Sequence, residues 1–373
     1  MNRRRLSIAV SGALLLLSAG CKKEVETSVS PAEQVQPTAD PAAAATNLDP
    51  AVLLTRAQAI FKPLPEVMEL STDPITPEKV ALGRQLYFEK RLSKNQDVSC
   101  NSCHDLTAYG VDSRGGKTSK GHKEQLGGRN SPTSYNAALH VAQFWDGRAL
   151  SVEEQAKGPV LNPVEMALPD AKTAVKVIKS IPGYKPLFKA AFPNDKDPIT
   201  FDNMAKAVGA FERKLVTKDR FDNFLQGSVT ALTDGELRGL STFMDAGCVA
   251  CHNGPGLGGA MYQKLGLMKP YETTDMGRFE VTKSDADKKV FKVPSLRNID
   301  KTGPYFHDGS KATLADAVAT MGEYQTPKGK LSDEEIASLV TFLKALTGEL
   351  PTDYIKAPAE LAGTKSTPKP DAS

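Results

Sequence analysis

Two short stretches of this chain share a pattern that constrains its fold more than any other feature. Residues 100–104 read Cys-Asn-Ser-Cys-His, and residues 248–252 read Cys-Val-Ala-Cys-His. Two thiols at this spacing can add to the two vinyl groups of one haem, and the adjacent imidazole then becomes the proximal ligand of the iron. The sequence therefore predicts two haem c groups, with the attachment residues Cys100, Cys103, Cys248 and Cys251 and the iron ligands His104 and His252.

Other sites can also use two cysteines at this spacing. A redox dithiol of the thioredoxin type needs only Cys-x-x-Cys, and a zinc half-site combines such a pair with further ligands. Neither explains why a histidine follows the second cysteine in both stretches, so the pattern favours covalently bound haem.

The N-terminal residues predict export and a lipid anchor. Residues 3–5 are arginines, an apolar run covers residues 8–17, and Cys21 follows Leu-Ser-Ala-Gly. A charged start before a short apolar run is typical of a signal peptide, and this cysteine resembles the lipidation site of a bacterial lipoprotein. A plain signal peptide with an incidental cysteine is the alternative. We expect a location on the periplasmic side of the envelope, because haem is attached outside the cytoplasm in the c-type cytochromes that this chain resembles.

The length of 373 residues allows two domains, each with a core of its own. Residues 22–50 are rich in Ala, Pro, Thr, Ser and Glu without an apolar period, and the composition after Tyr354 is again polar and proline-rich. We predict a signal peptide over 1–20, a lipid-anchor tether and linker over 21–65, a first haem domain over 66–215, a second haem domain over 216–356 and a disordered tail over 357–373.

The charge balance excludes one class of partner. The formal net charge is +3, and removal of residues 1–20 would take away three arginines and leave acids and bases in balance. A nucleic-acid partner would require a concentrated basic face, so none is expected.

The two halves of the chain repeat the same order of motifs. Phe-Trp-Asp-Gly-Arg at residues 144–148 resembles Phe-His-Asp-Gly-Ser at residues 306–310, and a short acidic helical segment follows each. Helix-capping residues precede both haem stretches, at Thr76 and Thr233. The predicted fold is mostly α, with two cytochrome c-like domains related by internal duplication and few short strands.

The residue that reaches the sixth coordination position decides whether a haem transfers electrons or catalyses a reaction. In the second half, Met321 lies beyond the 306–310 turn, and a thioether would raise the potential of that iron and close it to peroxide. An isolated methionine is more often a core residue. Because Glu165 and Met166 occupy the roughly equivalent place in the first half, we predict that Met321 ligates the second haem.

Three residues of the first half have candidate roles there. A carboxyl group above an open haem, such as Glu165, can move a proton between the two oxygens of a peroxide, although a surface glutamate is the alternative. The Gly-rich stretch 110–128 carries His122, which is either a movable cap on the first haem or a surface histidine; spacing does not decide. Trp145, the single tryptophan, is either a conduit between the irons or a core aromatic.

Together these motifs closely resemble the bacterial di-haem cytochrome c peroxidases, from about residue 66 to residue 355. The resemblance rests on both haem stretches and on the following segments, read from the sequence: Gly121-His122, Asn130-Ser131-Pro132-Thr133, residues 142–148, residues 162–167, residues 304–309 and Thr320-Met321-Gly322.

The family pattern implies a role for each site. The haem on His104 would be the low-potential peroxidatic one, with His122 as its resting distal ligand and Glu165 as the acid–base group. The haem on His252 and Met321 would accept electrons, and Trp145 would lie between the two. The resemblance also implies a calcium ion bound by Asn130 and the carbonyl oxygens of Thr302 and Pro304, reductive activation, and a homodimer.

The sequence therefore predicts a cytochrome c peroxidase that reduces hydrogen peroxide to water with electrons from a small cytochrome c or a cupredoxin. A di-haem electron carrier without peroxidase activity is the main alternative. A di-haem oxidase of protein side chains is a third, although such relatives carry Tyr where Met321 stands here.

Overall fold

The structure, a computed structural model, describes residues 48–69 and 73–373. The predicted signal peptide, the anchor cysteine Cys21 and the tether as far as residue 47 lie outside the described residues. Among the helices that are described, none is both long enough and apolar enough to cross a membrane.

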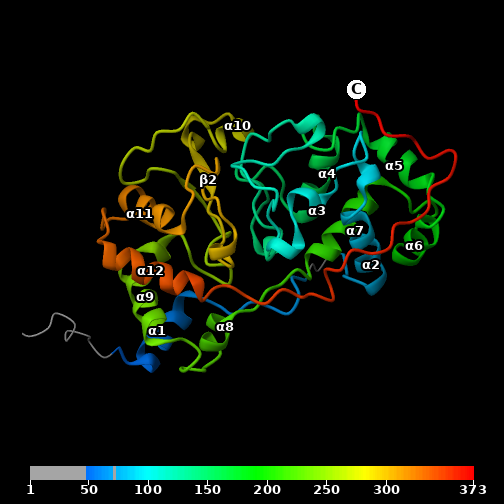
Figure 1. Ribbon diagram of the computed structural model, residues 1–373. Helices are drawn as coiled ribbons and strands as arrows, with labels where there is room; N and C mark the ends of the chain where they lie inside the picture. Colours follow the sequence, from blue (N-terminus) through cyan, green and yellow to red (C-terminus); the bar gives the residue numbers. More distant parts are fainter. Residues whose placement is uncertain (1–47, 70–72) are drawn as a thin grey trace, which may run out of the picture. The chain divides into compact units, whose positions relative to one another are not determined.

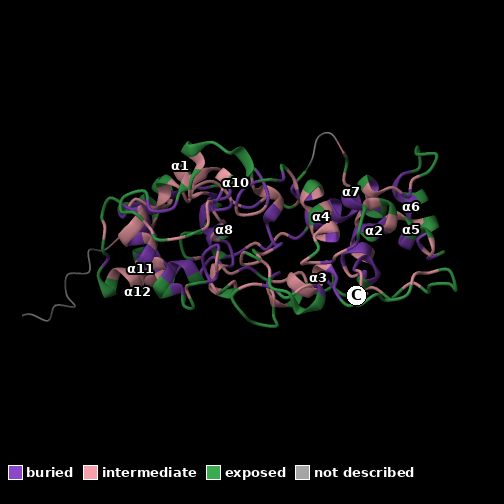
Figure 2. Cartoon of the chain, turned by 90° about the horizontal axis from the view of Figure 1, so that it is seen from above, coloured by how far each residue is buried: buried purple, intermediate pink, exposed green. Residues whose placement is uncertain are grey.

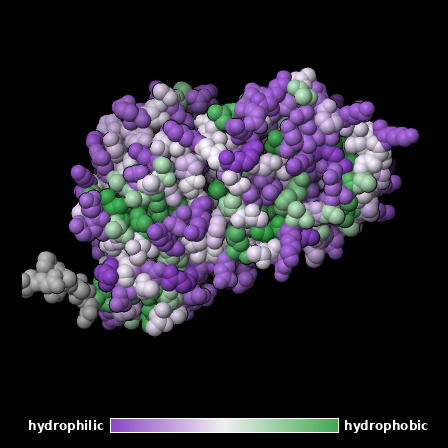
Figure 3. Space-filling model, in the orientation of Figure 1, coloured by the Kyte–Doolittle hydropathy of each residue, from purple (hydrophilic) through white to green (hydrophobic). Residues whose placement is uncertain are grey.

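The described chain is mostly helical, as the sequence predicts, and its buried residues form two separate hydrophobic clusters, each the core of one lobe (Figures 1 and 2). In the described residues the only sheet has two antiparallel strands, with Tyr262 paired to Lys292. Over the visible face, hydrophilic and hydrophobic residues are intermixed (Figure 3).

The first lobe holds the first haem stretch. Its helices are α2 (Pro77–Tyr87), α3 (Cys100–Cys103), α4 (Val152–Leu161), α5 (Ala171–Lys179), α6 (Tyr184–Ala191) and α7 (Phe201–Glu212). Helices α2 and α7 touch at Gly83, where an added Cβ would lie 1.8 Å from the carbonyl oxygen of Ala207. Only glycine allows the two backbones to come this close.

The second lobe repeats this arrangement around the second haem stretch. It contains α1 (Pro50–Ile60), α8 (Arg220–Leu225), α9 (Asp234–Asp245), α10 (Phe279–Thr282), α11 (Leu314–Gln325), α12 (Asp333–Lys344), β1 (Tyr262–Lys264) and β2 (Val290–Lys292). Here α9 and α12 meet at Gly239, where a Cβ would lie 2.2 Å from the carbonyl oxygen of Ser338.

Short 3-10 helices connect these elements. They are η2 (Lys90–Leu92), η3 (Leu106–Ala108), η4 (His122–Glu124), η5 (Ala137–Leu139), η6 (Cys248–Ala250), η7 (Asp285–Asp287) and η8 (Ile299–Lys301).

The predicted helix starts are confirmed by their caps. The side chain of Thr76 accepts a hydrogen bond from the Lys79 amide at the start of α2, and Thr233 and Glu236 form a reciprocal capping box at the start of α9. The chain over residues 201–224 forms two helices, α7 and α8. Between them the chain passes from one lobe to the other at Thr217, whose hydroxyl oxygen accepts hydrogen bonds from the side-chain amides of Asn136 and Asn298.

The predicted linker and tail also differ from the structure. Residues 50–60 of the predicted linker form α1, and Leu53 and Ala57 are buried in the core of the second lobe. Residues 357–373 carry no helix or strand, but they lie along the first lobe near α5 and α6 and are hydrogen-bonded to it (Figure 1). Local composition predicted a linker and a disordered tail, because composition contains no information about these long-range contacts.

Candidate active site

A cavity of about 350 Å³ in the first lobe brings together most of the residues predicted for the first haem. Its walls include Cys100, Cys103 and His104, together with Glu165 and Trp145. The two thiols and the imidazole therefore open onto the same space as the predicted acid–base group.

The first haem stretch forms a single helical turn. Ser99 and Ser102 make a capping box around α3, and the chain then turns at His104. The Nδ1 atom of His104 lies 3.0 Å from the carbonyl oxygen of Pro132, to which it can donate a hydrogen bond. Such a bond leaves Nε2 as the nitrogen that can bind iron. Desolvation lowers the pKa of His104, which favours the neutral form that a metal ligand needs.

The second haem stretch has the same plan. Gly247, at a φ of 85°, turns the chain into η6, and Nδ1 of His252 lies 3.0 Å from the carbonyl oxygen of Leu257. Burial again lowers the pKa of the imidazole. Both histidines are thus oriented by a backbone carbonyl, as proximal ligands usually are.

The donor set fits covalent haem. All four cysteines of the described chain are free thiols rather than disulfides. Burial raises the pKa of Cys100 to about 12 and that of Cys248 to about 11, so both sulfur atoms are held as thiols near neutral pH. Residues 100–104 and 248–252 would hold the two haems.

Glu165 lies in a tight turn just after the end of α4. The side-chain amide of Asn162 donates a 2.9 Å hydrogen bond to Oε1 of Glu165 and so fixes the orientation of the carboxyl group. Burial raises the pKa of Glu165, and the nearby Arg148 guanidinium and the Asn162 bond oppose this shift. The site therefore holds a carboxyl group that accepts and releases a proton more readily near neutral pH than an exposed glutamate does.

His122 is close to Glu165 but does not line the cavity. Its backbone amide donates a 2.8 Å hydrogen bond to the carbonyl oxygen of Glu165. The residue is 5% exposed, and Nε2 of its ring lies 3.3 Å from the main-chain oxygen of Ser373 in the C-terminal tail. The structure therefore places His122 beside Glu165, with its ring directed towards the tail.

Trp145 stands where the two lobes meet. Its indole Nε1 donates a 2.8 Å hydrogen bond to the carbonyl oxygen of Asn130, and its own carbonyl oxygen accepts one from the Lys292 amide in β2. Its ring lies edge-on to His307, with ring centroids 6.4 Å apart. A large aromatic ring of the first lobe therefore contacts the second lobe directly.

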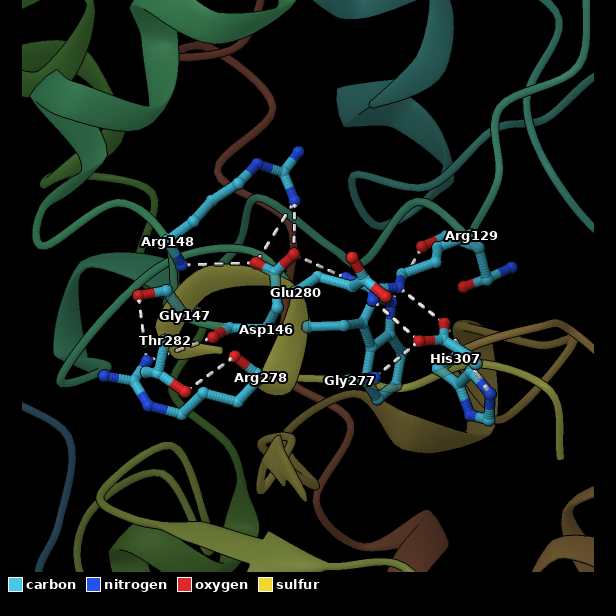
Figure 4. Close-up of polar contacts among 12 residues, drawn as sticks. Arg129, Asp146, Gly147, Arg148, Gly277, Arg278, Glu280, Thr282 and His307 are labelled. Atoms are coloured by element: carbon cyan, nitrogen blue, oxygen red, sulfur yellow. Dashed lines mark hydrogen bonds and ion pairs between the residues drawn. The ribbon is translucent and has the colours of Figure 1, made fainter. Parts of the chain in front are cut away.

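Ion pairs join the lobes around Trp145. Arg129 binds both carboxylate oxygens of Asp275 in the second lobe, at 2.7 and 2.8 Å, and donates to Asp146 at 2.6 Å. Figure 4 shows Asp146 between Arg129 and Arg148, with His307 beyond Arg129. The Asp146 side chain is only 6% exposed, so the carboxylate at the centre of this network is shielded from solvent.

The internal repeat extends to backbone geometry. Phe144 and Phe306 both have a left-handed φ, of 65° and 72°, and each turn is closed by a short antiparallel bridge. The helices that follow, α4 and α11, are capped by Ser151 and Thr313. The predicted duplication of these turns is therefore visible in their conformation.

The same offset in residue number that pairs Ser151 with Thr313 pairs Met321 with Pro159 on α4, which lines the first cavity. The rough equivalence of Met321 with Glu165 and Met166 is therefore wrong by about two helical turns. Proline has no side-chain atom that can ligate iron, so the correction strengthens the contrast between the lobes.

Met321 is partly buried on α11, where it packs against the apolar cluster of the second lobe. Cys248 packs against the same cluster, and the His252 ring lies 6.4 Å from the Phe243 ring within it. The structure thus places Met321 and the second haem stretch around one apolar core.

The three residues predicted to bind calcium present unused oxygens. The side-chain oxygen of Asn130 and the carbonyl oxygens of Thr302 and Pro304 accept no hydrogen bond from the described part of the chain. The Asn130 amide donates to the carbonyl oxygen of His307, which links this loop to the segment that follows Pro304. These are hard oxygen donors of the kind that calcium prefers.

The cavity also contains polar residues to which the sequence reasoning gave no role. They include Arg129, Arg148, Gln155 and Glu212. Glu212, at the end of α7, is buried, and desolvation raises its pKa to about 8. Gln155 could have been found from the sequence, because it lies on α4 one turn before Pro159. Glu212 could not, because only tertiary packing brings α7 to the cavity.

Comparisons with known proteins agree with this geometry. Residues 77–230 match the family model "Di-haem cytochrome c peroxidase", and residues 237–347 match the model "Cytochrome c". The chain is similar to the cytochrome c551 peroxidase of Nitrosomonas europaea, with 47% identity over 79% of this chain and 88% of that protein.

Two further matches cover most of the chain. The cytochrome c551 peroxidase of Pseudomonas aeruginosa is 45% identical over 84% of this chain and 91% of that protein. Among solved structures, a MauG-like protein associated with microbial copper homeostasis superposes with a TM-score of 0.70 and 29% identity, covering 79% of this chain and 97% of the other.

Proposed function

The chain belongs to the family of di-haem cytochrome c peroxidases, and on that premise we propose that it reduces hydrogen peroxide to water with electrons from a small cytochrome c or cupredoxin. One observation of the structure supports this most: Glu165, a partly buried carboxyl group, lines the same cavity as Cys100, Cys103 and His104. An electron carrier needs the last three residues but has no use for the carboxyl group.

Each residue of the first site has a defined task. Cys100 and Cys103 would hold the haem, and His104, oriented by Pro132, would ligate its iron. When bound, the haem supplies an iron that binds peroxide and carries electrons. Glu165 takes a proton from one peroxide oxygen and returns it to the other, while the Asn162 amide keeps its carboxyl group in position.

The second site would supply the electrons. His252 and Met321 would ligate the second haem, and the thioether would keep its potential high and its sixth position filled. Trp145 would lie between the two sites, since its ring already bridges the lobes at His307. We also propose that His122 binds the first haem in the resting protein and leaves it on reduction.

We propose that calcium binds to Asn130, Thr302 and Pro304. Asn130 is hydrogen-bonded through its backbone to His307 and Trp145, so a cation that joins Asn130 to Thr302 and Pro304 would stabilise the boundary between the lobes. Removal of calcium with a chelator should lower the melting temperature and slow turnover, and both should recover when calcium is restored.

We further propose that the mature protein is a lipoprotein anchored at Cys21 on the periplasmic side of the envelope, and that it forms a homodimer. The leader pattern supports the first proposal and the family resemblance the second. Cys21→Ser should release the protein from the membrane fraction, and sedimentation of the purified protein should give twice the monomer mass.

Stoichiometry tests the proposed activity. Reduced cytochrome c and peroxide should be consumed in a ratio of two to one, with water as the product. A protein that exchanges electrons with cytochrome c but consumes no peroxide would be an electron carrier. Peroxide consumption that requires an added protein substrate would instead indicate a side-chain oxidase.

A further inference from the structure

Resting on the proposed gating by His122, we propose that the C-terminal tail and Lys94 form a seat that holds the His122 ring away from the first haem. We define the tail seat as residues 364–373 together with Lys94. This goes beyond the proposed function, because it assigns a positioning role to a segment whose composition predicted only disorder.

The tail is fixed to the first lobe at successive points. The side chain of Gln96 donates a 2.7 Å hydrogen bond to the carbonyl oxygen of Pro368, and the Asp371 amide donates one of 2.9 Å to the carbonyl oxygen of Lys94. Near the end of α5, the hydroxyl of Thr367 donates to the carbonyl oxygen of Ser180 at 3.1 Å. These contacts fix the path of the tail as far as Ser373.

Lys94 connects the end of this path to the active site. Its Nζ donates to the main-chain oxygen of Ser373 at 2.9 Å and lies 3.7 Å from the Asp371 carboxylate. Its backbone amide donates a 2.8 Å hydrogen bond to the carbonyl oxygen of Met166. Met166 directly follows Glu165, so the seat is attached to the segment that carries the acid–base group.

The His122 ring occupies the seat. Its Nε2 lies 3.3 Å from the main-chain oxygen of Ser373, and because this oxygen accepts, a hydrogen bond here requires a proton on Nε2. A nitrogen that donates this bond cannot bind iron at the same time. The other nitrogen, Nδ1, is enclosed and has no partner among the described residues. The seated ring is therefore excluded from the iron.

The backbone beside His122 shows that this position must be held. Lys123 and Glu124 both have left-handed φ values, 57° and 58°, in a pair of non-glycine residues. This conformation costs free energy that surrounding contacts must offset. The bond from the His122 amide to Glu165 and the bond from its ring to Ser373 are two such contacts. Loss of the seat should shift the loop towards the state in which His122 binds iron.

The test uses the half-reduced holoprotein. Optical and electron paramagnetic resonance spectra give two populations of the first haem, one with a free sixth position and one with histidine bound. The measured quantity is the ratio of the first population to the second. Lys94→Ala should lower this ratio by about 3- to 10-fold, the effect of one or two hydrogen bonds. A chain ended after Gly363 should lower it further, and Lys94→Arg should restore most of it.

Lys90→Ala is the matched control, because Lys90 is exposed on η2 and its side chain makes no hydrogen bond or ion pair in the described structure. It should leave the ratio unchanged. Melting temperature and haem content show whether each variant is folded. If the shortened chain is unstable, the Lys94→Ala variant alone tests the proposal. An unchanged ratio in folded Lys94→Ala overturns the seat while leaving the peroxidase function intact. If the wild-type first haem never opens, the proposed gating fails instead.

Discussion

In the first lobe, α4 presents Gln155 and Pro159 to an open cavity, whereas in the second lobe α11 packs Met321 against an apolar cluster. The proximal sides of the two sites match, since His104 and His252 each place Nδ1 3.0 Å from a backbone carbonyl oxygen. One duplicated scaffold therefore holds two haems in the same way and differs on the opposite side. Under the proposed ligation, Met321 would fill the sixth position of the second haem, whereas Pro159 at the equivalent helical position offers no ligand to the first.

The largest expected effect comes from removing the thioether from the second site. Met321→Leu should abolish turnover with reduced cytochrome c, because the second haem loses the ligand that keeps its potential high enough to accept electrons. Steady-state assays and a potentiometric titration of that haem provide the measurement. Met268→Leu, at a 51% exposed methionine of the same lobe, is the control and should be silent. Wild-type rates in Met321→Leu would remove the ligand role.

The next largest effect should come from the acid–base group of the first site. Glu165→Gln should keep peroxide binding but slow peroxide cleavage by about 10²- to 10⁴-fold, the usual contribution of general acid–base catalysis. Stopped-flow spectra of the half-reduced protein separate these two steps. Glu154→Gln, at an exposed position on α4, is the control. A normal cleavage rate in Glu165→Gln would exclude Glu165 from the mechanism.

The pH dependence should reveal the same carboxyl group. Glu165 must be ionised to accept a proton, so activity falls as the pH decreases through its pKa. Burial raises that pKa, and the acid limb of kcat/KM should therefore lie above the ordinary glutamate value of about 4.3. The limb should disappear in Glu165→Gln, and a limb that persists unchanged would belong to another group.

Much of this contrast could be predicted from the sequence, because its signals are local. The haem stretches, the caps at Thr76 and Thr233 and the paired turns at Phe144 and Phe306 all occupy consecutive residues, and the structure confirms their geometry. The rough alignment of Glu165 with Met321 was wrong because the two residues lie at different distances from the caps of their helices.

The remaining features depend on residues far apart in the chain. Nothing near Arg129 indicates that it will bind Asp275, and the linker composition around residue 60 does not reveal that α1 enters the core of the second lobe. The same holds for the tail contacts of Lys94. Such pairings arise from the packing of whole elements, which a single sequence does not show.

A moderate effect is expected where the two lobes meet. Arg129→Met should lower the free energy of unfolding by about 1–3 kcal/mol, because the buried carboxylates lose a charged hydrogen-bond donor. Thermal unfolding of the holoprotein measures this change. Arg238→Met, at an exposed arginine on α9, should have little effect. Equal melting temperatures for wild type and Arg129→Met would show that these ion pairs do not stabilise the boundary.

The smallest effect concerns Glu212 in the first cavity. Because burial raises its pKa to about 8, its contribution to stability is fully present below the unfolded value of about 4.3 and is lost as the pH rises through 8. The melting temperature of Glu212→Gln minus that of wild type should therefore be larger at pH 8 than at pH 5. A difference that stays constant between pH 5 and pH 8 would show that Glu212 does not titrate in this range.

The asymmetry of the two iron sites is tested most directly by adding one electron per protein and recording the magnetic circular dichroism of both haems before and after addition of peroxide. We expect the electron to reside on a haem with methionine ligation, while the other haem exposes a free coordination position and reacts with peroxide on mixing. Spectra in which both irons keep two protein ligands at every redox level, with no reaction on addition of peroxide, would contradict it.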